Sequence, residues 1–381
     1  MTKLISLELD YGIKVSSRVH DYLSPDNVYF PISKTSKIKI KDKEKILKGQ
    51  LILINGEEKI FSSVSGIITG RKRVIINNQE KTFLVIANDY KEKSIKKSIR
   101  KKFDIKDKNE LENILKDYGI NISMDIKDTL LLNAIDPEPY LVNNTMYLLK
   151  NINSVLESLD NLKTILNFKK VIILLKNIET EILTKLNNIL GTYPDFRVIT
   201  VPNYYMIERK ENYNVYIDEA IENIFELSLT NYYKINEVLE KNKPVTEKYI
   251  TITGDAIKNP IVINAKIGTK VSKIIEELIK IKKDEINISY YYNGLMKGYK
   301  TEINDLIIDN DFEGLVITKN TLAKEEKCIK CGLCLKYCPL GISPIDNINK
   351  EIKCLNCGLC TCLCPSNINF KNITKKDDKY E

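Results

Sequence analysis

Eight cysteines near the end of the chain form two runs of identical spacing, and they are the residues best suited to chemistry. The runs comprise Cys328, Cys331, Cys334 and Cys338, followed by Pro339, and Cys354, Cys357, Cys360 and Cys364, followed by Pro365. Each run reads C-x2-C-x2-C-x3-C-P, a spacing in which three cysteines bind one [4Fe–4S] cluster and the fourth binds the neighbouring cluster. We therefore expect two [4Fe–4S] clusters. One would be held by Cys328, Cys331, Cys334 and Cys364, and the other by Cys354, Cys357, Cys360 and Cys338.

Other uses of these thiols fit the pattern less well. Structural zinc takes two separated cysteine pairs around one ion, whereas each run here places three thiols within seven residues. Disulfides require an oxidising compartment, and the first residues, Met1 to Leu4, do not begin an apolar signal sequence. The ninth cysteine, Cys362, is interpreted as a small packed residue beside the second cluster, with a substitute ligand or a reactive thiol as alternatives. Gly332 and Gly358 each follow the second cysteine of a run and would let the backbone approach the sulfurs closely.

Composition indicates an ordinary cytoplasmic protein of two to four domains. The chain has 381 residues, of which 43% are hydrophobic and 29% charged. A formal net charge of +8 suggests nucleic-acid binding, but the lysines are interleaved with Glu and Asp, which favours a solvated surface. No apolar run is long enough for a membrane span, the longest including residues 171–175. The single histidine, His20, is interpreted as an ordinary residue, which argues against a histidine-based triad.

Residues 1–92 are predicted to form a small β domain. Short apolar or alternating runs occur at residues 36–40, 51–54, 66–69, 74–76 and 83–86, with turn residues at Asn55-Gly56 and Asn77-Asn78. The turn pattern resembles that of biotinyl or lipoyl barrel-sandwich modules. No lysine has the flanked hairpin context that a modified carrier lysine requires, so we expect the barrel without that modification. A lysine-rich linker is expected at residues 91–106.

Residues 101–240 are predicted to form an α/β domain with a mostly parallel sheet. Expected strands at 129–132, 171–175 and 197–201 alternate with helices at 110–118, within 139–166 and at 179–190. Such a fold suggests nucleotide binding, which requires a glycine-rich turn beside the phosphates. The only glycines between residues 101 and 240 are Gly119 and Gly191. The expected scaffold therefore lacks a recognisable phosphate-binding loop.

Residues 245–320 are predicted to form a β-grasp module ahead of a cluster-binding domain at residues 321–375. Expected strands lie at 249–253, 261–267, 286–292 and 314–318, with a helix at 271–282. Tyr290, Tyr291 and Tyr292 could stack on a ligand, but a cross-strand ladder is the preferred interpretation. The overall fold class is thus multidomain α/β and α+β.

This order of modules resembles the RnfC family of electron-transport proteins and its relative PrdC, the electron-transfer protein associated with proline reductase. The resemblance covers most of residues 28–370. It rests on Lys48-Gly49-Gln50, Ser63-Val64-Ser65-Gly66, residues 133–140 (NAIDPEPY), residues 253–260 (TGDAIKNP), residues 317–319 leading into Cys328, and residues 364–368. It implies a barrel-sandwich domain, a Rossmann-like domain of the complex I flavin-subunit type, a soluble-ligand-binding β-grasp (SLBB) domain and a two-cluster ferredoxin-type domain.

Three departures distinguish this chain from that family. The glycine-rich GxGGAGFPT-like loop before residue 133 is absent, and residues 203–210 (NYYMIERK) replace a KYPQGGEK-like stretch. These two changes weaken the prediction of FMN and NADH binding. The third departure is a short spacer: only 15 residues, 339–353, separate the two cysteine runs. This short spacer does not affect the cysteines that would bind the clusters. Asn133, Glu138 and Tyr140 match residues that line the flavin and nicotinamide pocket in relatives; we interpret them as structural remnants, with a working site as the alternative.

Three functions follow from these observations. The leading hypothesis is a cytoplasmic electron carrier that passes single electrons through two clusters between donor and acceptor proteins, an amino-acid reductase system or an Rnf-type complex being the analogous partners. The second is an NADH- and flavin-dependent oxidoreductase subunit of an Rnf-type membrane complex, peripheral at the inner face of the membrane. The third is a non-redox docking adaptor in which the clusters only stabilise the C-terminus.

Overall fold

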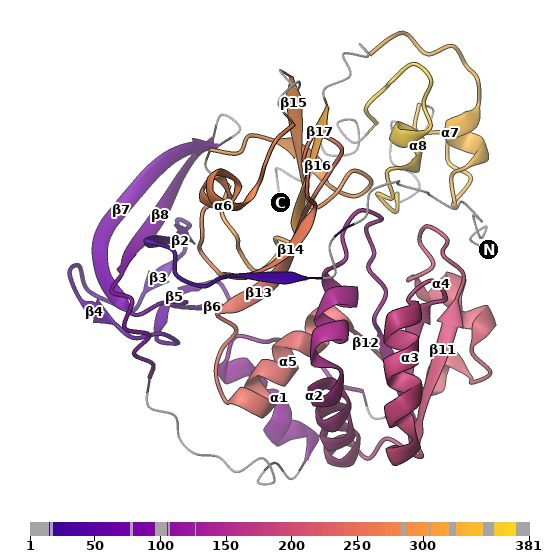
Figure 1. Cartoon of the computed structure of the whole chain (residues 1–381), viewed down its shortest axis with the longest axis horizontal. Coiled ribbons are helices and arrows are strands. Elements are labelled where there is room, and N and C mark those ends of the chain that lie inside the picture. The colour runs from indigo at the N-terminus through magenta and orange to yellow at the C-terminus, as the bar shows by residue number, and fades with distance from the viewer. Residues whose placement is uncertain are drawn as a thin grey trace.

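The chain folds into four β-sheets with flanking helices, and the two cysteine runs form short helical turns at one end (Figure 1). The structure, a computed structural model, describes residues 15, 18–76, 79–95, 105, 107–125, 127–282, 287–304, 306–319, 325–345 and 354–370. Asn77-Asn78 and most of the expected linker at 91–106 lie outside the described residues. The observed architecture is a mixed α/β fold with several sheets, as the sequence predicts.

A four-stranded parallel sheet lies at the centre of the α/β part of the chain. Its strands are β9 (Thr129–Asn133), β10 (Lys170–Lys176), β11 (Phe196–Val201) and β12 (Ile224–Ser228), in the order β11-β10-β9-β12. The helices are α1 (Lys108–Asp117), α2 (Asn143–Leu166), α3 (Thr180–Ile189), α4 (Lys210–Tyr213) and α5 (Leu229–Lys241), with 3-10 turns at Leu190–Thr192, Asn214–Tyr216 and Ile221–Asn223. The strand order reverses between β9 and β12, where α/β folds usually place their ligands.

Both faces of this sheet are buried, which explains the uninterrupted apolar runs of its strands. Along β9, Leu130 and Leu132 point into the core formed with α1, α2, α3 and α5, whereas Leu131 points into the core on the opposite face. The sequence predicts β9, β10 and β11 within two residues at each end. It does not predict β12 or α5, because the short run Ile224–Ser228 contains a glutamate and lacks a turn signal before α5.

A six-stranded sheet contains most of residues 245–320. In spatial order it comprises β1 (Val19–Tyr22), β14 (Ile261–Lys266), β13 (Glu247–Thr253), β17 (Gly314–Lys319), β15 (Ile288–Tyr292) and β16 (Tyr299–Thr301), with α6 (Val271–Leu278) packed against it. β1 pairs in parallel with β14, a contact between distant segments that the sequence pattern does not reveal. Tyr292 stacks on Tyr299 with ring centroids 4.9 Å apart, the cross-strand arrangement expected for these tyrosines.

Two further sheets lie near the N-terminal end and enclose a separate apolar core. One consists of β2 (Asn27–Ile32), β8 (Gln79–Asn88), β7 (Gly66–Ile76) and β4 (Lys45–Ile46), and the other of β3 (Lys37–Ile38), β5 (Leu51–Asn55) and β6 (Glu58–Phe61). The two runs expected at 66–69 and 74–76 are parts of the single strand β7. The core contains Val28, Phe30, Ile52 and Ile86, each at most 1% exposed.

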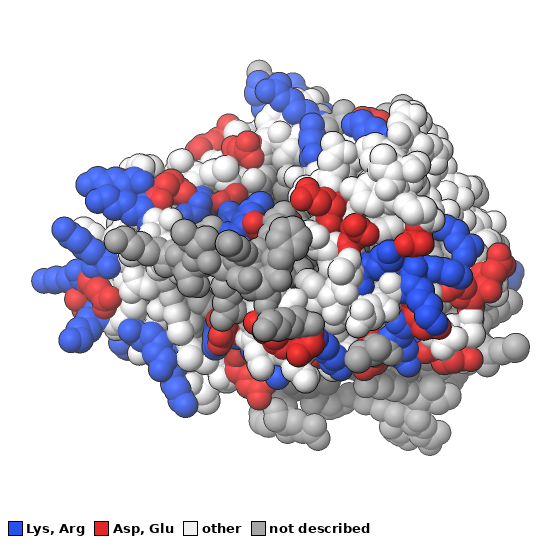
Figure 2. Space-filling view, turned by 90° about the horizontal axis from the view of Figure 1, so that it is seen from below, with Lys and Arg blue, Asp and Glu red and all other residues white. Residues whose placement is uncertain are grey.

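The surface carries basic and acidic side chains in mixture. On the face shown in Figure 2, blue and red residues are interspersed, with many of the basic ones at the end formed by the N-terminal sheets. This distribution agrees with a solvated surface. Among the helices that the structure describes, none is both long and apolar enough to cross a bilayer.

Charged networks join the sheets to one another. Lys266 on β14 is only 1% exposed, and its Nζ lies 3.1 Å from the carboxylate of Glu247 and 3.2 Å from that of Glu92. Lys48, from the N-terminal part of the chain, lies 2.5 Å from Glu92 and 3.2 Å from Glu247. Burial alone would raise the pKa of Glu247, but Lys266 and Lys48 lower it to about 2. Two lysines and two glutamates thus link three segments distant in sequence.

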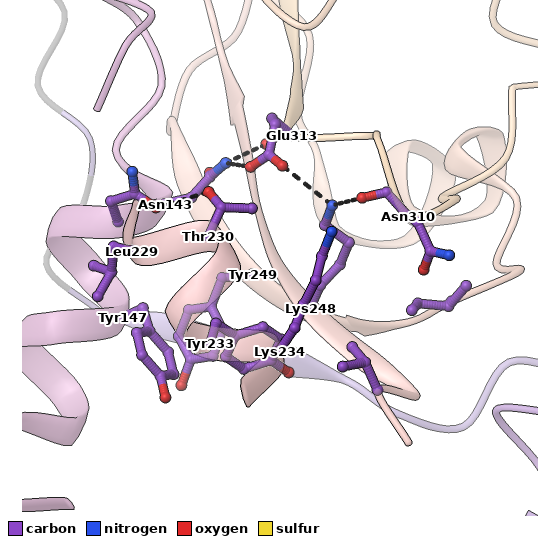
Figure 3. Close-up of a pocket in the computed structure, with 13 residues that line it drawn as sticks. Asn143, Tyr147, Leu229, Thr230, Tyr233, Lys234, Lys248, Tyr249, Asn310 and Glu313 are labelled. Carbon is purple, nitrogen blue, oxygen red and sulfur yellow. Dashed lines mark hydrogen bonds and ion pairs between the residues drawn. The ribbon is translucent and has the colours of Figure 1, made fainter. Parts of the chain in front are cut away.

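A second polar joint connects the parallel sheet to the six-stranded sheet (Figure 3). The Lys248 ammonium lies 2.7 Å from the Asn310 carbonyl oxygen and 3.3 Å from the Glu313 carboxylate, and the Asn143 side chain donates to the Glu313 carbonyl over 2.7 Å. Tyr147 packs edge-on against Tyr233 and Tyr249 beside them. The remaining cavity measures about 40 Å³, so we interpret this place as a domain joint.

Replacing Glu247 by Gln tests the first network. Because the buried Lys266 would lose one of its two counter-charges, Glu247→Gln should lower the free energy of unfolding by roughly 2 kcal/mol at pH 7. The deficit should shrink as the pH falls from about 4.5 towards about 2, since the native Glu247 then also becomes protonated. Anaerobic urea titrations at several pH values measure both effects.

The control is Glu276→Gln on α6, whose partner Lys273 is exposed. This change should alter the unfolding free energy by less than about 0.5 kcal/mol at every pH. A Glu247→Gln deficit no larger than that of the control would contradict a structural role for the network.

Candidate metal centre

The two cysteine runs have the same backbone conformation. A short helix follows each glycine, α7 (Leu333–Lys336) after Gly332 and α8 (Leu359–Cys362) after Gly358, and the two helices lie beside each other (Figure 1). Both glycines are left-handed, with φ of 73° and 77°. Lys330 and Asn356, at equivalent positions before them, are also left-handed, with φ of 56° and 51°. The identical spacing therefore produces two loops that curl in the same way, as cluster-binding loops must.

Backbone N–H groups in both loops point at cysteine sulfurs. The N–H of Lys330 donates to Sγ of Cys328 and the N–H of Asn356 donates to Sγ of Cys354, each over 3.3 Å. These donors stabilise thiolates, the form of cysteine that binds iron. Burial raises the pKa of Cys360 to about 11, so its deprotonation depends on the positive charge of bound iron. The loops thus fit iron–sulfur ligation.

One cysteine of the first run lies near the second run. Burial raises the pKa of the Cys357 thiol, and Cys354 and Cys338 lie close enough to raise it further. The last cysteine of the first run therefore lies beside the loop of the second. Within the described residues, no three His, Cys, Asp or Glu side chains converge closely enough to surround one ion. The thiolates of a [4Fe–4S] cluster instead stand at the four corners of a larger body.

The second run is packed against the parallel sheet and the six-stranded sheet. A Cβ atom at Gly358 would lie 1.9 Å from the carbonyl oxygen of Met296, so only glycine fits there. The hydroxyl of Tyr205 donates to the carbonyl of Cys357 over 2.6 Å. Cys357 is 7% exposed and belongs to an apolar cluster with Tyr205, Met296, Met206 and Leu359. Tyr205 and Met206 come from the segment that replaces the family's KYPQGGEK-like stretch.

Glu138 holds the loop on which the second run rests. Its carboxylate accepts the backbone N–H groups of Met296 and Lys297, over 2.7 and 2.6 Å. Gly294 of the same loop lies so close that an added Cβ would come within 2.2 Å of the Glu138 side chain. Glu138 is 3% exposed. Its carboxylate is thus engaged by the protein backbone directly beneath the second cysteine run.

Asn133 ends β9 and is also engaged by protein groups. Its amide donates to the Glu208 carbonyl and to the Glu226 carboxylate, each over 2.8 Å. The Glu208 carboxylate in turn lies 2.6 Å from the ammonium of Lys297. Asn133 is therefore linked to the loop held by Glu138 through Glu208 and Lys297.

Tyr140 lies near Glu138 and also lines a cavity of its own. It is half-buried; burial raises its pKa, and the nearby Cys362 and Asp255 raise it further. With Thr145 and Glu179 it lines a cavity of about 280 Å³. The spare cysteine, Cys362, lies near Tyr140 and is exposed, so the structure does not show it as the packed residue that the sequence suggested.

Three residues at this edge were missed by sequence reasoning. Asp136 accepts the backbone N–H groups of Asn144 and Thr145 at the start of α2, and its complete burial raises its pKa to about 7. Tyr205 and Met296 contact the second cysteine run from two different parts of the chain. No local pattern could identify the contacts of Tyr205 and Met296, because both depend on the packing of segments far apart in sequence. The Asp136 contacts span only eight and nine residues, but the sequence contains no recognised cap signal there.

Comparison with known proteins connects this geometry with a family. A model of the 4Fe–4S binding domain matches residues 324–342. The C subunit of a proton-translocating ferredoxin:NAD(+) oxidoreductase complex from Clostridium ljungdahlii is 26% identical over 230 residues, which cover 57% of this chain and 50% of the relative. The C subunit of an ion-translocating oxidoreductase complex from Buchnera aphidicola is 23% identical over 347 residues, covering 81% and 71%.

Other matches cover less of the compared proteins. The equivalent protein of an ion-translocating oxidoreductase complex from Pectobacterium atrosepticum is 22% identical over 236 residues, 57% of this chain and 33% of the relative. A crystal structure of NAD+-reducing [NiFe]-hydrogenase in the air-oxidized state superposes with a TM-score of 0.43 and 8% identity, over 55% of this chain and 46% of the other. The chain thus spans half or less of the length of several relatives that it matches.

The family matches extend well beyond the cysteines that any ferredoxin-type domain shares. They cover 57–81% of the chain, and the cysteine-rich end matches a 4Fe–4S domain in addition. The resemblance inferred from the sequence motifs is therefore confirmed: the chain is similar to RnfC-like C subunits over 57–81% of its length and carries a match to a 4Fe–4S binding domain.

Proposed function

We propose that this protein passes single electrons through two [4Fe–4S] clusters between redox partner proteins. Cys328, Cys331, Cys334 and Cys364 would hold one cluster, and Cys354, Cys357, Cys360 and Cys338 the other. The observation that carries the proposal is the repeated loop, in which equivalent residues have the same left-handed backbone and an equivalent N–H donates to the first sulfur. Bound clusters supply reversible one-electron chemistry. The loops supply thiolates, N–H donors and partial shielding from water.

The proximity of Cys338 to Cys357 supports the crossed assignment. In such an arrangement the chain between the runs binds both clusters and holds them at a fixed, short separation. A short separation favours rapid electron exchange between them. The domain boundaries at 92, 101–240, 245–320 and 321–375, and the identities of the barrel-sandwich and SLBB modules, form part of this proposal.

We further propose that the chain receives electrons singly and not as hydride from NADH. In relatives the residues matching Asn133 and Glu138 line a flavin and nicotinamide pocket. Here the Glu138 carboxylate accepts two backbone N–H groups, and the Asn133 amide donates to Glu208 and Glu226. These contacts support the interpretation of both residues as structural residues that help to position the second cysteine run. An Rnf-type complex or an amino-acid reductase remains the analogous partner system.

Cofactor content tests the proposed function directly. Protein purified without oxygen should contain about eight iron atoms per chain and no flavin. Its visible absorbance should bleach with dithionite and not with NADH, because no hydride acceptor is bound. Flavin absorbance together with bleaching by NADH alone would instead establish the oxidoreductase alternative.

Two cysteine substitutions test the ligand assignment. Cys364→Ser should remove one cluster, lowering iron content from about eight to about four atoms per chain. The matched control, Cys362→Ser, lies two residues away and should keep the full iron content. Iron analysis and low-temperature EPR of the reduced proteins measure both. Equal iron loss in the two variants would show that the spare cysteine also serves as a ligand.

A substitution at Tyr205 tests the packing of the second cysteine run against the rest of the protein. Tyr205→Phe removes the hydrogen bond to the buried Cys357 carbonyl, which should cost about 1 kcal/mol of stability. About half of the iron should then be released faster to a chelator, because only the second loop is loosened. Tyr204→Phe is the control in the same segment. Release of iron at the native rate from Tyr205→Phe would contradict a role for this hydrogen bond in holding the second cysteine run.

A further inference from the structure

The two cysteine runs differ in what covers them, although their backbones match. At Gly332 in the first run, an added Cβ would meet nothing within 4 Å. At the equivalent Gly358 in the second run, it would meet the Met296 carbonyl oxygen at 1.9 Å. The sequence repeat thus provides an internal comparison. One loop is pressed against the rest of the protein, and the other is open.

The first run faces solvent along most of its length. Residues 325–332 are all exposed, including Cys328 and Cys331. In the second run Cys357 is 7% and Leu359 1% exposed. A partner protein can therefore approach the first run closely, whereas the body of the protein already occupies the corresponding side of the second. We call residues 328–338 the outer loop.

The outer loop presents apolar and basic side chains. Ile329 is 66% exposed and Leu335 46% exposed. Lys330 and Lys336 lie beside them, and no acidic residue occurs between Cys328 and Cys338. The second run, between Cys354 and Cys364, has no charged residue at all.

Two acidic residues, Glu325 and Glu326, precede the outer loop. The N–H of Glu326 donates to the Ser366 carbonyl over 2.9 Å, which attaches this segment to the chain after the second run. An exposed apolar centre with basic neighbours is typical of a transient interface for a partner of opposite charge.

We propose that the outer loop is the docking surface for a small acidic protein that carries one electron at a time. The proposal rests on the proposed function and adds the place and chemistry of the partner. On contact, one electron leaves the reduced centre of the carrier, which is thereby oxidised, and enters the cluster behind the outer loop. No bond forms and no proton moves. The second cluster then communicates with the first inside the protein and not with this partner.

Charge reversal on the outer loop tests the docking surface. The full-length holoprotein is mixed in a stopped-flow instrument with an acidic ferredoxin, pre-reduced and freed of reductant, at low and high salt. In Lys336→Glu the second-order rate of electron transfer at low salt should fall about threefold or more, and its decline with added salt should weaken. Reduction by methyl viologen radical should stay within about twofold of native in both proteins.

The matched control is Lys72→Glu. Lys72 is exposed on β7, a strand at the opposite end of the molecule from α7 (Figure 1), and the change in net charge is the same. This control should retain the native rate with ferredoxin to within about twofold. Iron content is measured for all three proteins to verify that the clusters are intact.

The outcomes separate the two proposals. Suppose that the clusters accept electrons from methyl viologen. If the rate with ferredoxin is then insensitive to the outer-loop charge, or falls equally in the control, the docking surface is overturned and the proposed function stands. A faster rate after charge reversal would identify a basic partner and overturn the proposal. Dimerisation of the native protein that the outer-loop variant abolishes would assign the surface to a second copy, which also overturns it. Failure of the native protein to accept electrons even from dithionite would overturn the proposed function itself.

Discussion

The arrangement at the cysteine-rich end depends on one buried carboxylate. Glu138 accepts two backbone N–H groups from the loop at residues 293–298, and that loop supplies the Met296 carbonyl against which Gly358 packs. Without these acceptors the N–H groups would be buried and unpaired, at a cost of about 1–3 kcal/mol each. The position of the second cysteine run is therefore set by the C-terminal edge of the parallel sheet through one loop of the six-stranded sheet.

This dependence explains why distant parts of the chain must be fixed relative to one another. Lys266 is almost wholly buried between Glu247 and Glu92, and Lys248 bridges Asn310 and Glu313 at the joint with α2. Buried ion pairs contribute little net stability, but they penalise any displacement that separates the charges. These joints therefore hold the sheets in fixed relative positions. The surface on which the second cysteine run packs, which is formed by two of the sheets, then keeps its shape.

The sequence allowed prediction of those features that depend on local patterns. The cysteine spacing, the left-handed glycines after the second cysteines, and the buried strands β9 and β10 all follow from periodicity or turn chemistry over a few residues. The pairing of β1 with β14 and the contact of Tyr205 with Cys357 could not be predicted, because each joins segments separated by more than 100 residues. For Glu138 the sequence motif identified a candidate site residue, but nothing local identified its hydrogen-bond partners.

At the C-terminal edge of the parallel sheet, polar side chains contact other protein groups and help to position the second cysteine run. Where strand order reverses in an α/β sheet, backbone and side-chain polar groups converge and must be satisfied by a ligand, by water or by the protein. In this chain residues without glycine occupy the place of the family's KYPQGGEK-like segment, and Tyr205 and Met206 pack on the second cysteine run instead. Asn133 and Glu138 then find partners in Glu208, Met296 and Lys297. Packing thus explains why Asn133 and Glu138 are polar in this chain, because removing either one would leave buried groups unpaired.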